Sequence, residues 1–229
     1  MAAMTALDGL VTRRTTTAQQ LADGLSERIL AGAFRPGERL RESAIAAELG
    51  IARNTVREAG RLLELGGLVR FEVNHGAMVI SLTRESVDEL YTARDRLERA
   101  ALATPLHGDG LARVEAAFDG FVNETASRDR ARIVAADLSF HAAVVATLGS
   151  GRIDAFYSVL TRELRFYLMA ISAHDREFEH PDKLIAEHEP LMDAVRAGDC
   201  VRAQREAGHH IASNAERVRK VLAACDGGA

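Results

Sequence analysis

Cysteine and long apolar runs are scarce in this chain of 229 residues. Its two cysteines, Cys200 and Cys225, form no CxxC pair, and we find no signal peptide ahead of them. This usage excludes a disulfide scaffold and indicates a reducing compartment. The longest apolar stretch, residues 140–148, is far shorter than the roughly 20 residues that span a bilayer. We therefore expect a cytoplasmic protein with no membrane role.

Positive charge is limited too, and almost all of it is arginine. The chain has 29 Lys and Arg against 33 Asp and Glu, a formal net charge of -4, which taken alone disfavours nucleic-acid binding. Residues 1–80, however, carry ten Arg and nine acidic residues, net +1, whereas the remainder carries 19 basic and 24 acidic residues, net -5. The acidity lies in the second part, so the first part remains a candidate for binding nucleic acid.

Two short helices are predicted near the N-terminus from apolar residues spaced along one helix face. The first covers residues 18–32 and precedes a turn at Pro36 and Gly37. The second begins with Ser43 as its expected cap and stops at Gly50.

A third helix, residues 54–65, is predicted to present a basic ridge, because Arg53, Arg57 and Arg61 recur every four residues. Two strands follow, at 68–71 and 77–81, around an Asn-His-Gly turn suited to a hairpin. For the arginines alone, a solvated helix face is the alternative. The order of three helices and a hairpin favours a winged helix-turn-helix, whose last helix enters the major groove of DNA.

Residues 32–79 resemble the winged-helix domain of the GntR family of bacterial regulators. The most specific segments are PGERL at 36–40, LGIARNTVREA at 49–59 and the His-Gly pair of the hairpin. Ala52 departs from the family, which more often has a hydroxyl residue there. Glu58 is expected to hold an arginine by an ion pair. The resemblance implies that the DNA-binding residues are Ser43, Arg53, Asn54, Thr55 and Arg57, with His75 and Gly76 at the tip of the wing.

Beyond Thr83 the strand signals stop, and five or six amphipathic helices follow. The fold is therefore expected to be mainly α, with the winged helix followed by an all-α antiparallel helical bundle. We expect a flexible N-terminus at 1–16, a DNA-binding domain at 17–81, and an effector-binding and dimerisation domain at 82–229. The breaks between the helices of the bundle are predicted near residues 108–110, 127–130, 149–151, 174–181 and 198–199.

Four polar side chains are predicted to meet inside this bundle. Asp137 and His141 are four residues apart and share the apolar face of one helix. His188 lies ten residues before Gly198 and His210 eleven after Asp199, so at about 1.5 Å per residue both reach a similar height above that turn. For any single histidine, a hydrogen-bonded core residue is the alternative; together, one carboxylate and three imidazoles suit a divalent transition metal.

The competing residue His209 shares a polar face, which favours His210. Residues 91–103, 137–141, 187–188 and 197–211 resemble the FCD effector domain of the FadR subfamily. This resemblance implies that Asp137, His141, His188 and His210 hold zinc, with nickel or manganese as alternatives, beside a carboxylate effector. Pro190 makes His188 the weakest of the four assignments, because proline removes a helical hydrogen bond.

Arg94 lies on the inward stripe of its helix and is predicted to bind the effector carboxylate through its planar fork of donors. A structural salt bridge to Glu98 or Asp137 is the open alternative.

The sequence thus predicts a homodimeric transcription repressor that binds a pseudo-palindromic DNA operator and responds to a small carboxylic acid. Effector binding would reposition the linker around residues 81–85. One alternative is an acyl-CoA-responsive regulator without metal. Another is a metal-dependent hydrolase, which we disfavour because we identify no separate inward carboxylate as a general base. We expect no enzymatic activity.

Overall fold

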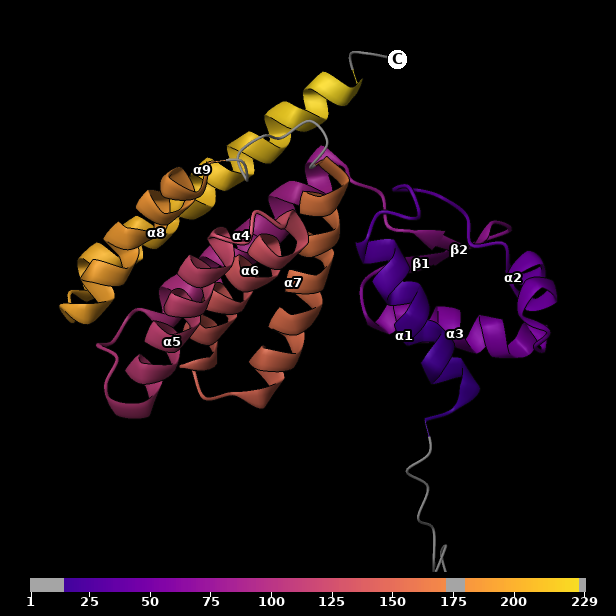
Figure 1. Ribbon diagram of the computed structural model, residues 1–229, viewed down its shortest axis with the longest axis horizontal. Coiled ribbons are helices and arrows are strands. Elements are labelled where there is room, and N and C mark those ends of the chain that lie inside the picture. The colour runs from indigo at the N-terminus through magenta and orange to yellow at the C-terminus, as the bar shows by residue number, and fades with distance from the viewer. Residues whose placement is uncertain (1–14, 172–179, 227–229) are drawn as a thin grey trace, which may run out of the picture.

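The computed structural model describes residues 15–171 and 180–226, and these form two lobes joined by a short linker (Figure 1). The N-terminal lobe contains three helices and a hairpin, and the other lobe contains only helices. The predicted mainly α fold is confirmed. The flexible segment expected at 1–16 lies outside the described residues, apart from residues 15 and 16.

The N-terminal lobe is a winged helix-turn-helix, as predicted. The helix α1 packs against α3, and the two strands pair antiparallel with Val69 opposite Val79. Ser43 does not cap α2; the cap is Arg41, which makes no side-chain capping bond, so that expectation was wrong. The elements are α1 (Thr17–Leu30), α2 (Glu42–Leu49), α3 (Arg53–Leu65), β1 (Val69–Glu72) and β2 (Gly76–Val79).

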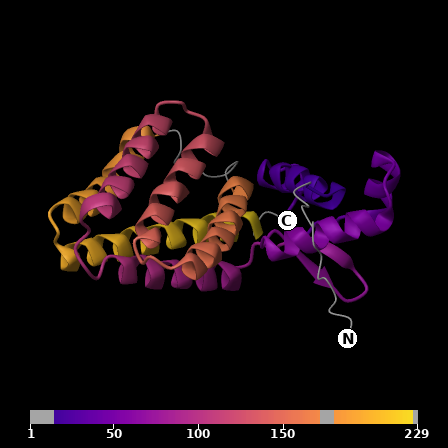
Figure 2. The same ribbon diagram turned by 90° about the horizontal axis from the view of Figure 1, so that it is seen from below.

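The second lobe is a bundle in which helices adjacent in sequence pack together, as α5 with α6, α6 with α7 and α8 with α9. The first and last helices, α4 and α9, also pack together, and Figure 2 shows them running side by side. The predicted break at 174–181 lies mostly outside the described residues. The helices are α4 (Arg84–Ala101), α5 (Gly108–Thr125), α6 (Arg130–Ala146), α7 (Gly151–Ile171), α8 (Pro181–Arg196) and α9 (Cys200–Asp226).

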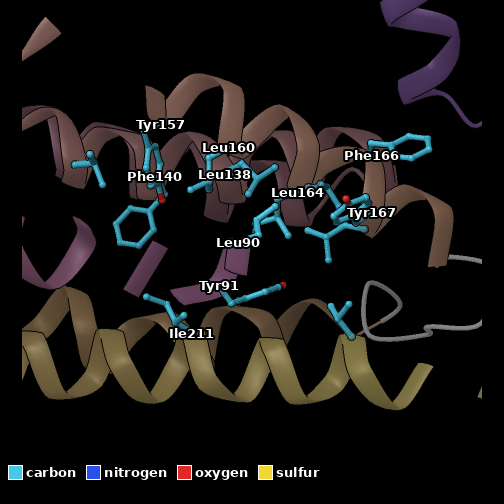
Figure 3. Packing of buried hydrophobic residues seen from close by; sticks show 14 of the residues in the cluster. Leu90, Tyr91, Leu138, Phe140, Tyr157, Leu160, Leu164, Phe166, Tyr167 and Ile211 are labelled. Carbon is cyan, nitrogen blue, oxygen red and sulfur yellow. The ribbon is translucent and has the colours of Figure 1, made fainter. Parts of the chain in front are cut away.

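The core of this lobe is built from large side chains of several helices (Figure 3). Phe140 of α6, Tyr157 and Leu164 of α7 and Ile211 of α9 are all almost fully buried. Each large apolar side chain buried in this way stabilises the fold by about 1.5–3 kcal/mol. Among the described residues, no helix has the length and apolar character needed to cross a membrane.

The linker between the lobes ends in a capping box at the start of α4. The Thr83 hydroxyl accepts a hydrogen bond from the Ser86 amide at 3.1 Å, and the Ser86 hydroxyl accepts one from the Thr83 amide at 3.0 Å. Two backbone donors without helical partners are thereby satisfied, which defines where α4 begins.

Replacing Thr83 with alanine is expected to lower the free energy of unfolding by about 1 kcal/mol, because the capping bond is lost. Urea denaturation followed by circular dichroism measures the change. Thr104→Ala, at an exposed position outside any helix, is the matched control and is expected to change little. An unchanged midpoint in Thr83→Ala would show that the cap does not limit the stability of α4.

Candidate nucleic-acid interface and metal centre

A groove of about 1140 Å³ lies between α2, α3 and the wing. Its lining is strongly basic, as expected for a surface that binds a phosphate backbone. The arginines that line it are Arg39, Arg41, Arg53, Arg57 and Arg61.

Glu42, the first residue of α2, positions two of these arginines. Its carboxylate lies 3.4 Å from Arg53 Nε and 3.8 Å from Arg57 Nε, and its side chain is only 10% exposed, whereas the two arginine side chains are 71% and 58% exposed. Exposed pairs of this kind contribute little stability, and both guanidinium groups remain largely accessible in the groove. The sequence predicted Glu58 as the residue that holds an arginine by an ion pair. Glu58 is exposed and forms none of the ion pairs found in the described part of the chain, so that prediction was wrong.

The predicted DNA-binding residues fall into two groups. Ser43, Arg53, Arg57 and Gly76 line the groove. Asn54, Thr55 and His75 lie outside its lining. Asn54 and Thr55 are in the first turn of α3, and His75 is exposed at the tip of the wing.

Sequence reasoning missed Arg39 and Arg41. They flank Leu40, whose amide donates to the carbonyl of Ala77 at 2.8 Å, and Arg39 forms a β-bridge with Met78. The segment before α2 therefore lies along the wing and turns both arginines into the groove. The alternation of basic and apolar residues over 39–41 was the signal that could have identified them.

Arg57→Ala is expected to weaken binding to duplex DNA and to make the dependence of log affinity on log salt shallower by about one unit, because one phosphate contact is lost. Fluorescence anisotropy over a salt series measures both effects. Arg28→Ala, an exposed change in α1 outside the groove lining, is the control. A slope equal to that of the wild type would mean that Arg57 contacts no phosphate.

The structure brings the four predicted metal ligands together inside the bundle. One ligand atom from each of Asp137, His141, His188 and His210 lies within 4.8 Å of the others. The ring centroids of His188 and His210 are 4.2 Å apart, and those of His141 and His210 are 5.0 Å apart. His209 is exposed, and α8 continues through Pro190 without displacing His188 from the cluster.

Two of these histidines direct their Nε2 atom into the cluster. His141 Nδ1 lies 2.7 Å from Glu98 Oε2, and His188 Nδ1 lies 2.8 Å from the Leu184 carbonyl, so in each ring Nδ1 carries the proton. Both Nε2 atoms are buried and face the same oxygen of Asp137, Oδ1, at 2.8 Å from His188 and 3.7 Å from His141. Proteins hold a metal-binding histidine in this way: one ring nitrogen donates to a hydrogen-bond acceptor, and the lone pair of the other points at the metal position.

Glu98 is the residue of this centre that sequence reasoning assigned no role beyond a possible partner for Arg94. It is fully buried on α4 and accepts hydrogen bonds from Arg94 Nε at 2.6 Å, His141 Nδ1 at 2.7 Å and the Tyr157 hydroxyl at 2.7 Å. The site therefore contains a further inward carboxylate, but one whose oxygens already accept three hydrogen bonds. Its position four residues after Arg94, on the same stripe, was the available signal.

Electrostatics keep the carboxylates ionised and two imidazoles neutral. Burial opposes ionisation of Glu98, but the hydrogen bonds donated by His141 and Arg94, together with the charge of Arg94, lower its pKa to about 2. Burial likewise opposes ionisation of Asp137, yet His188 and His141 hold its pKa well below the usual range. Burial, with the Arg94 charge, lowers the pKa of His141. Burial and the neighbouring histidines lower that of His210 well below its ordinary value. Neutral imidazole and ionised carboxylate are the forms that bind metal.

Arg94 forms the salt bridge to Glu98 that was the alternative to effector binding, and one of its other nitrogens is still available as a donor. Its Nε is paired with Glu98, while its Nη2 is buried without a hydrogen-bond partner. The Tyr91 hydroxyl is also buried and unpaired, and burial raises its pKa to about 12, so it remains a donor. Both residues line a small cavity of about 20 Å³ beside His188 and His210. That volume holds a water molecule or an ion.

A winged helix with an arginine-lined groove, joined to a helical lobe, is the architecture of a DNA-binding transcription regulator. Family comparison agrees, since residues 17–79 match the family described as "Bacterial regulatory proteins, gntR family" and residues 89–213 match the FCD domain. The chain belongs to the GntR family of bacterial regulatory proteins and has the FadR-like organisation, with an FCD domain after the winged helix.

Relatives of similar length support this assignment. The chain is 30% identical to the "Probable D-xylose utilization operon transcriptional repressor" of Paenarthrobacter nicotinovorans, over 87% of this chain and 88% of that protein. It is 25% identical to the gluconate operon transcriptional repressor of Bacillus licheniformis, over 81% and 78%. A GntR transcriptional regulator from Rhodococcus sp. RHA1, solved by crystallography, has a TM-score of 0.71 and 31% identity, over 90% and 98%. The predicted family and the absence of an enzymatic role are confirmed.

Glu98→Gln is expected to lower the free energy of unfolding of the metal-free protein by about 3–5 kcal/mol, because the buried Arg94 charge loses its anionic partner. Urea denaturation in the presence of EDTA measures it. Glu115→Gln breaks the exposed pair with Arg196, at 3.3 Å, and is expected to cost at most about 1 kcal/mol. Equal effects of the two changes would contradict a dominant role for the buried pair.

Proposed function

We propose that this regulator is a repressor whose affinity for its operator changes when a small carboxylic acid binds beside a divalent metal in the second lobe. The observation that carries the proposal is the convergence of four ligand atoms within 4.8 Å, in which the buried Nε2 atoms of His141 and His188 both face Asp137 Oδ1. An orphaned polar atom in a protein core has a desolvation cost that a bound cation removes. Repression follows the roles named for the two operon repressors to which the chain is similar.

The chain's own donors fit a transition metal, with Asp137, His141, His188 and His210 as its ligands. Three imidazoles and one carboxylate favour zinc first, with nickel or manganese as alternatives. The ion would supply positive charge and open coordination positions for an acid. Glu98 and the Leu184 carbonyl hold two of the rings in the orientation that binding needs.

The acid is expected to meet Arg94 Nη2 and the Tyr91 hydroxyl, the two unpaired donors that border the cavity. An arginine beside a cation recognises a carboxylate by charge and by geometry together. A cavity of about 20 Å³ admits only part of such a molecule, so the pocket must widen when the acid binds.

We assign DNA binding to residues 17–81, through Ser43, Arg53, Asn54, Thr55, Arg57, His75 and Gly76, and effector binding and dimerisation to residues 82–229. A twofold dimer would present two recognition helices to a pseudo-palindromic operator, because symmetry of the protein matches symmetry of its site. A regulator of this kind acts in the bacterial cytoplasm. The small cavity disfavours a long acyl-CoA effector, and the three hydrogen bonds that Glu98 accepts disfavour its use as a hydrolytic base.

His141→Ala is expected to abolish retention of zinc, because one of four ligands is lost, and with it any thermal stabilisation by small carboxylic acids. Metal analysis of purified protein and a thermal-shift screen with zinc and a panel of such acids provide the measurements. His209→Ala, an exposed histidine next to the ligand His210, is the matched control and is expected to behave as the wild type. Zinc retained by His141→Ala, or stabilisation of metal-free wild type by acyl-CoA alone, would overturn the proposal.

A further inference from the structure

The helix α7 contacts both the buried centre of the second lobe and the end of the recognition helix α3. Figure 3 shows Tyr157 in the first half of α7 and Tyr167 near its end, along one face of the core. Between them, Val159 and Arg162 reach the first lobe at Gly66 and Gly67, directly after α3. One rigid element therefore spans the distance between the two sites.

At the inner contact, a single carboxylate separates α7 from the metal-binding cluster. The Tyr157 hydroxyl donates to Glu98 Oε1, and Glu98 Oε2 lies 2.7 Å from His141 Nδ1. All three side chains are 0–2% exposed. Because the space is closely packed, a change in the orientation of the His141 ring changes the hydrogen bond that Glu98 offers to Tyr157.

At the outer contact, Arg162 Nη1 donates to the carbonyl of Gly66, the C-cap of α3, at 3.1 Å. Gly66 has φ of -81°, which any residue adopts, so its backbone does not require glycine. What α7 adds is close approach: a Cβ atom at Gly66 would lie 2.6 Å from Nη1 at the end of the Arg162 side chain. At Gly67, where φ of +75° already favours glycine, a Cβ atom would lie 2.7 Å from Val159 Cγ1. The end of the recognition helix is thus seated directly on α7.

The contact between the lobes is narrow at this point. Grooves of about 500 Å³ and 260 Å³ both border Arg162, and α1 lines each of them. The Tyr167 hydroxyl adds one bond, at 3.3 Å, to the carbonyl of Ser81 in the linker. A small displacement of α7 therefore acts on the first lobe at α1, at the end of α3 and at the linker, and a groove beside the end of α3 leaves space for it to move.

We propose that α7 couples the metal-binding cluster to the recognition helix, with Glu98–Tyr157 as its inner contact and Arg162–Gly66 as its outer contact. The coupling rests on the proposed metal site. Binding at His141 Nε2 fixes the ring and its Nδ1 proton, which fixes Glu98, Tyr157 and, through the helix, Arg162. The Gly66 carbonyl, and with it the end of α3, then occupies one position instead of several.

Hydrogen exchange of the full-length protein, with and without zinc, tests the coupling at residues 66–68. Their amides donate to the carbonyls of Leu62, Glu64 and Leu63, so their exchange reports opening at the end of α3. Zinc is expected to slow this exchange in the wild type by at least about fivefold, the lower end of ordinary coupling between sites. Arg162→Met keeps most of the apolar stem and removes the donor, and is expected to abolish the zinc-dependent difference while zinc still binds.

Tyr157→Phe removes the hydroxyl that donates to Glu98 and so breaks the inner contact. It is expected to abolish the zinc-dependent difference in exchange in the same way. Arg152→Met, the same change at an exposed position on α7, is the control and should retain it. A merely structural role of Arg162 would change exchange equally with and without zinc, and would leave the difference intact. That result, or wild-type protein that binds zinc with no change at 66–68, overturns the coupling. Failure of the wild type to bind zinc is measured separately and overturns the metal proposal itself.

Discussion

The Glu98 carboxylate is buried among three helices and accepts hydrogen bonds from Arg94 on its own helix, His141 on α6 and Tyr157 on α7. A buried charge is tolerated only when it is paired and hydrogen-bonded, so these three donors stabilise the lobe. The same bonds determine which nitrogen of His141 faces the cluster and which hydroxyl α7 directs inward. The orientation of the candidate metal site and the position of α7 therefore have one common cause.

In the two lobes, charged side chains are positioned in opposite ways. In the groove of the winged helix, Glu42 lies beside Arg53 and Arg57 but leaves them largely exposed. Their charge remains available to a phosphate backbone, and binding is expected to depend on salt. In the second lobe, Arg94 and Glu98 are buried away from water. Electrostatic screening is weak there, so the strength of their interaction depends on its geometry. The first arrangement suits a large polyanion, and the second suits one small ion or acid.

Much of the fold could be predicted from the sequence because it depends on local patterns. Helical periodicity, the glycine breaks and the Asn-His-Gly turn located the winged helix and the breaks of the bundle outside residues 172–179. The metal cluster followed from the same rules, since Asp137 and His141 share one helix face and the turn at Gly198 brings His188 level with His210. The predictions that failed concerned which residues pair when they lie far apart in the sequence. Glu42 replaced Glu58 as the partner of the groove arginines, and Glu98 had no assigned role at the cluster, because no periodicity along one helix encodes which other helix it will meet.

The sequence by itself determined the class of this protein: a winged helix with arginines at 53, 57 and 61, and a bundle with one carboxylate and three histidines on inward stripes. Such features depend on residue spacing within single helices, which is a property of the chain alone. Only the tertiary structure decided that Arg94 is shared between Glu98 and the cavity and that Arg162 reaches the Gly66 carbonyl. These contacts join segments distant in the chain, and hydrogen-bond geometry between packed elements selects them rather than the pattern of residues within any one element.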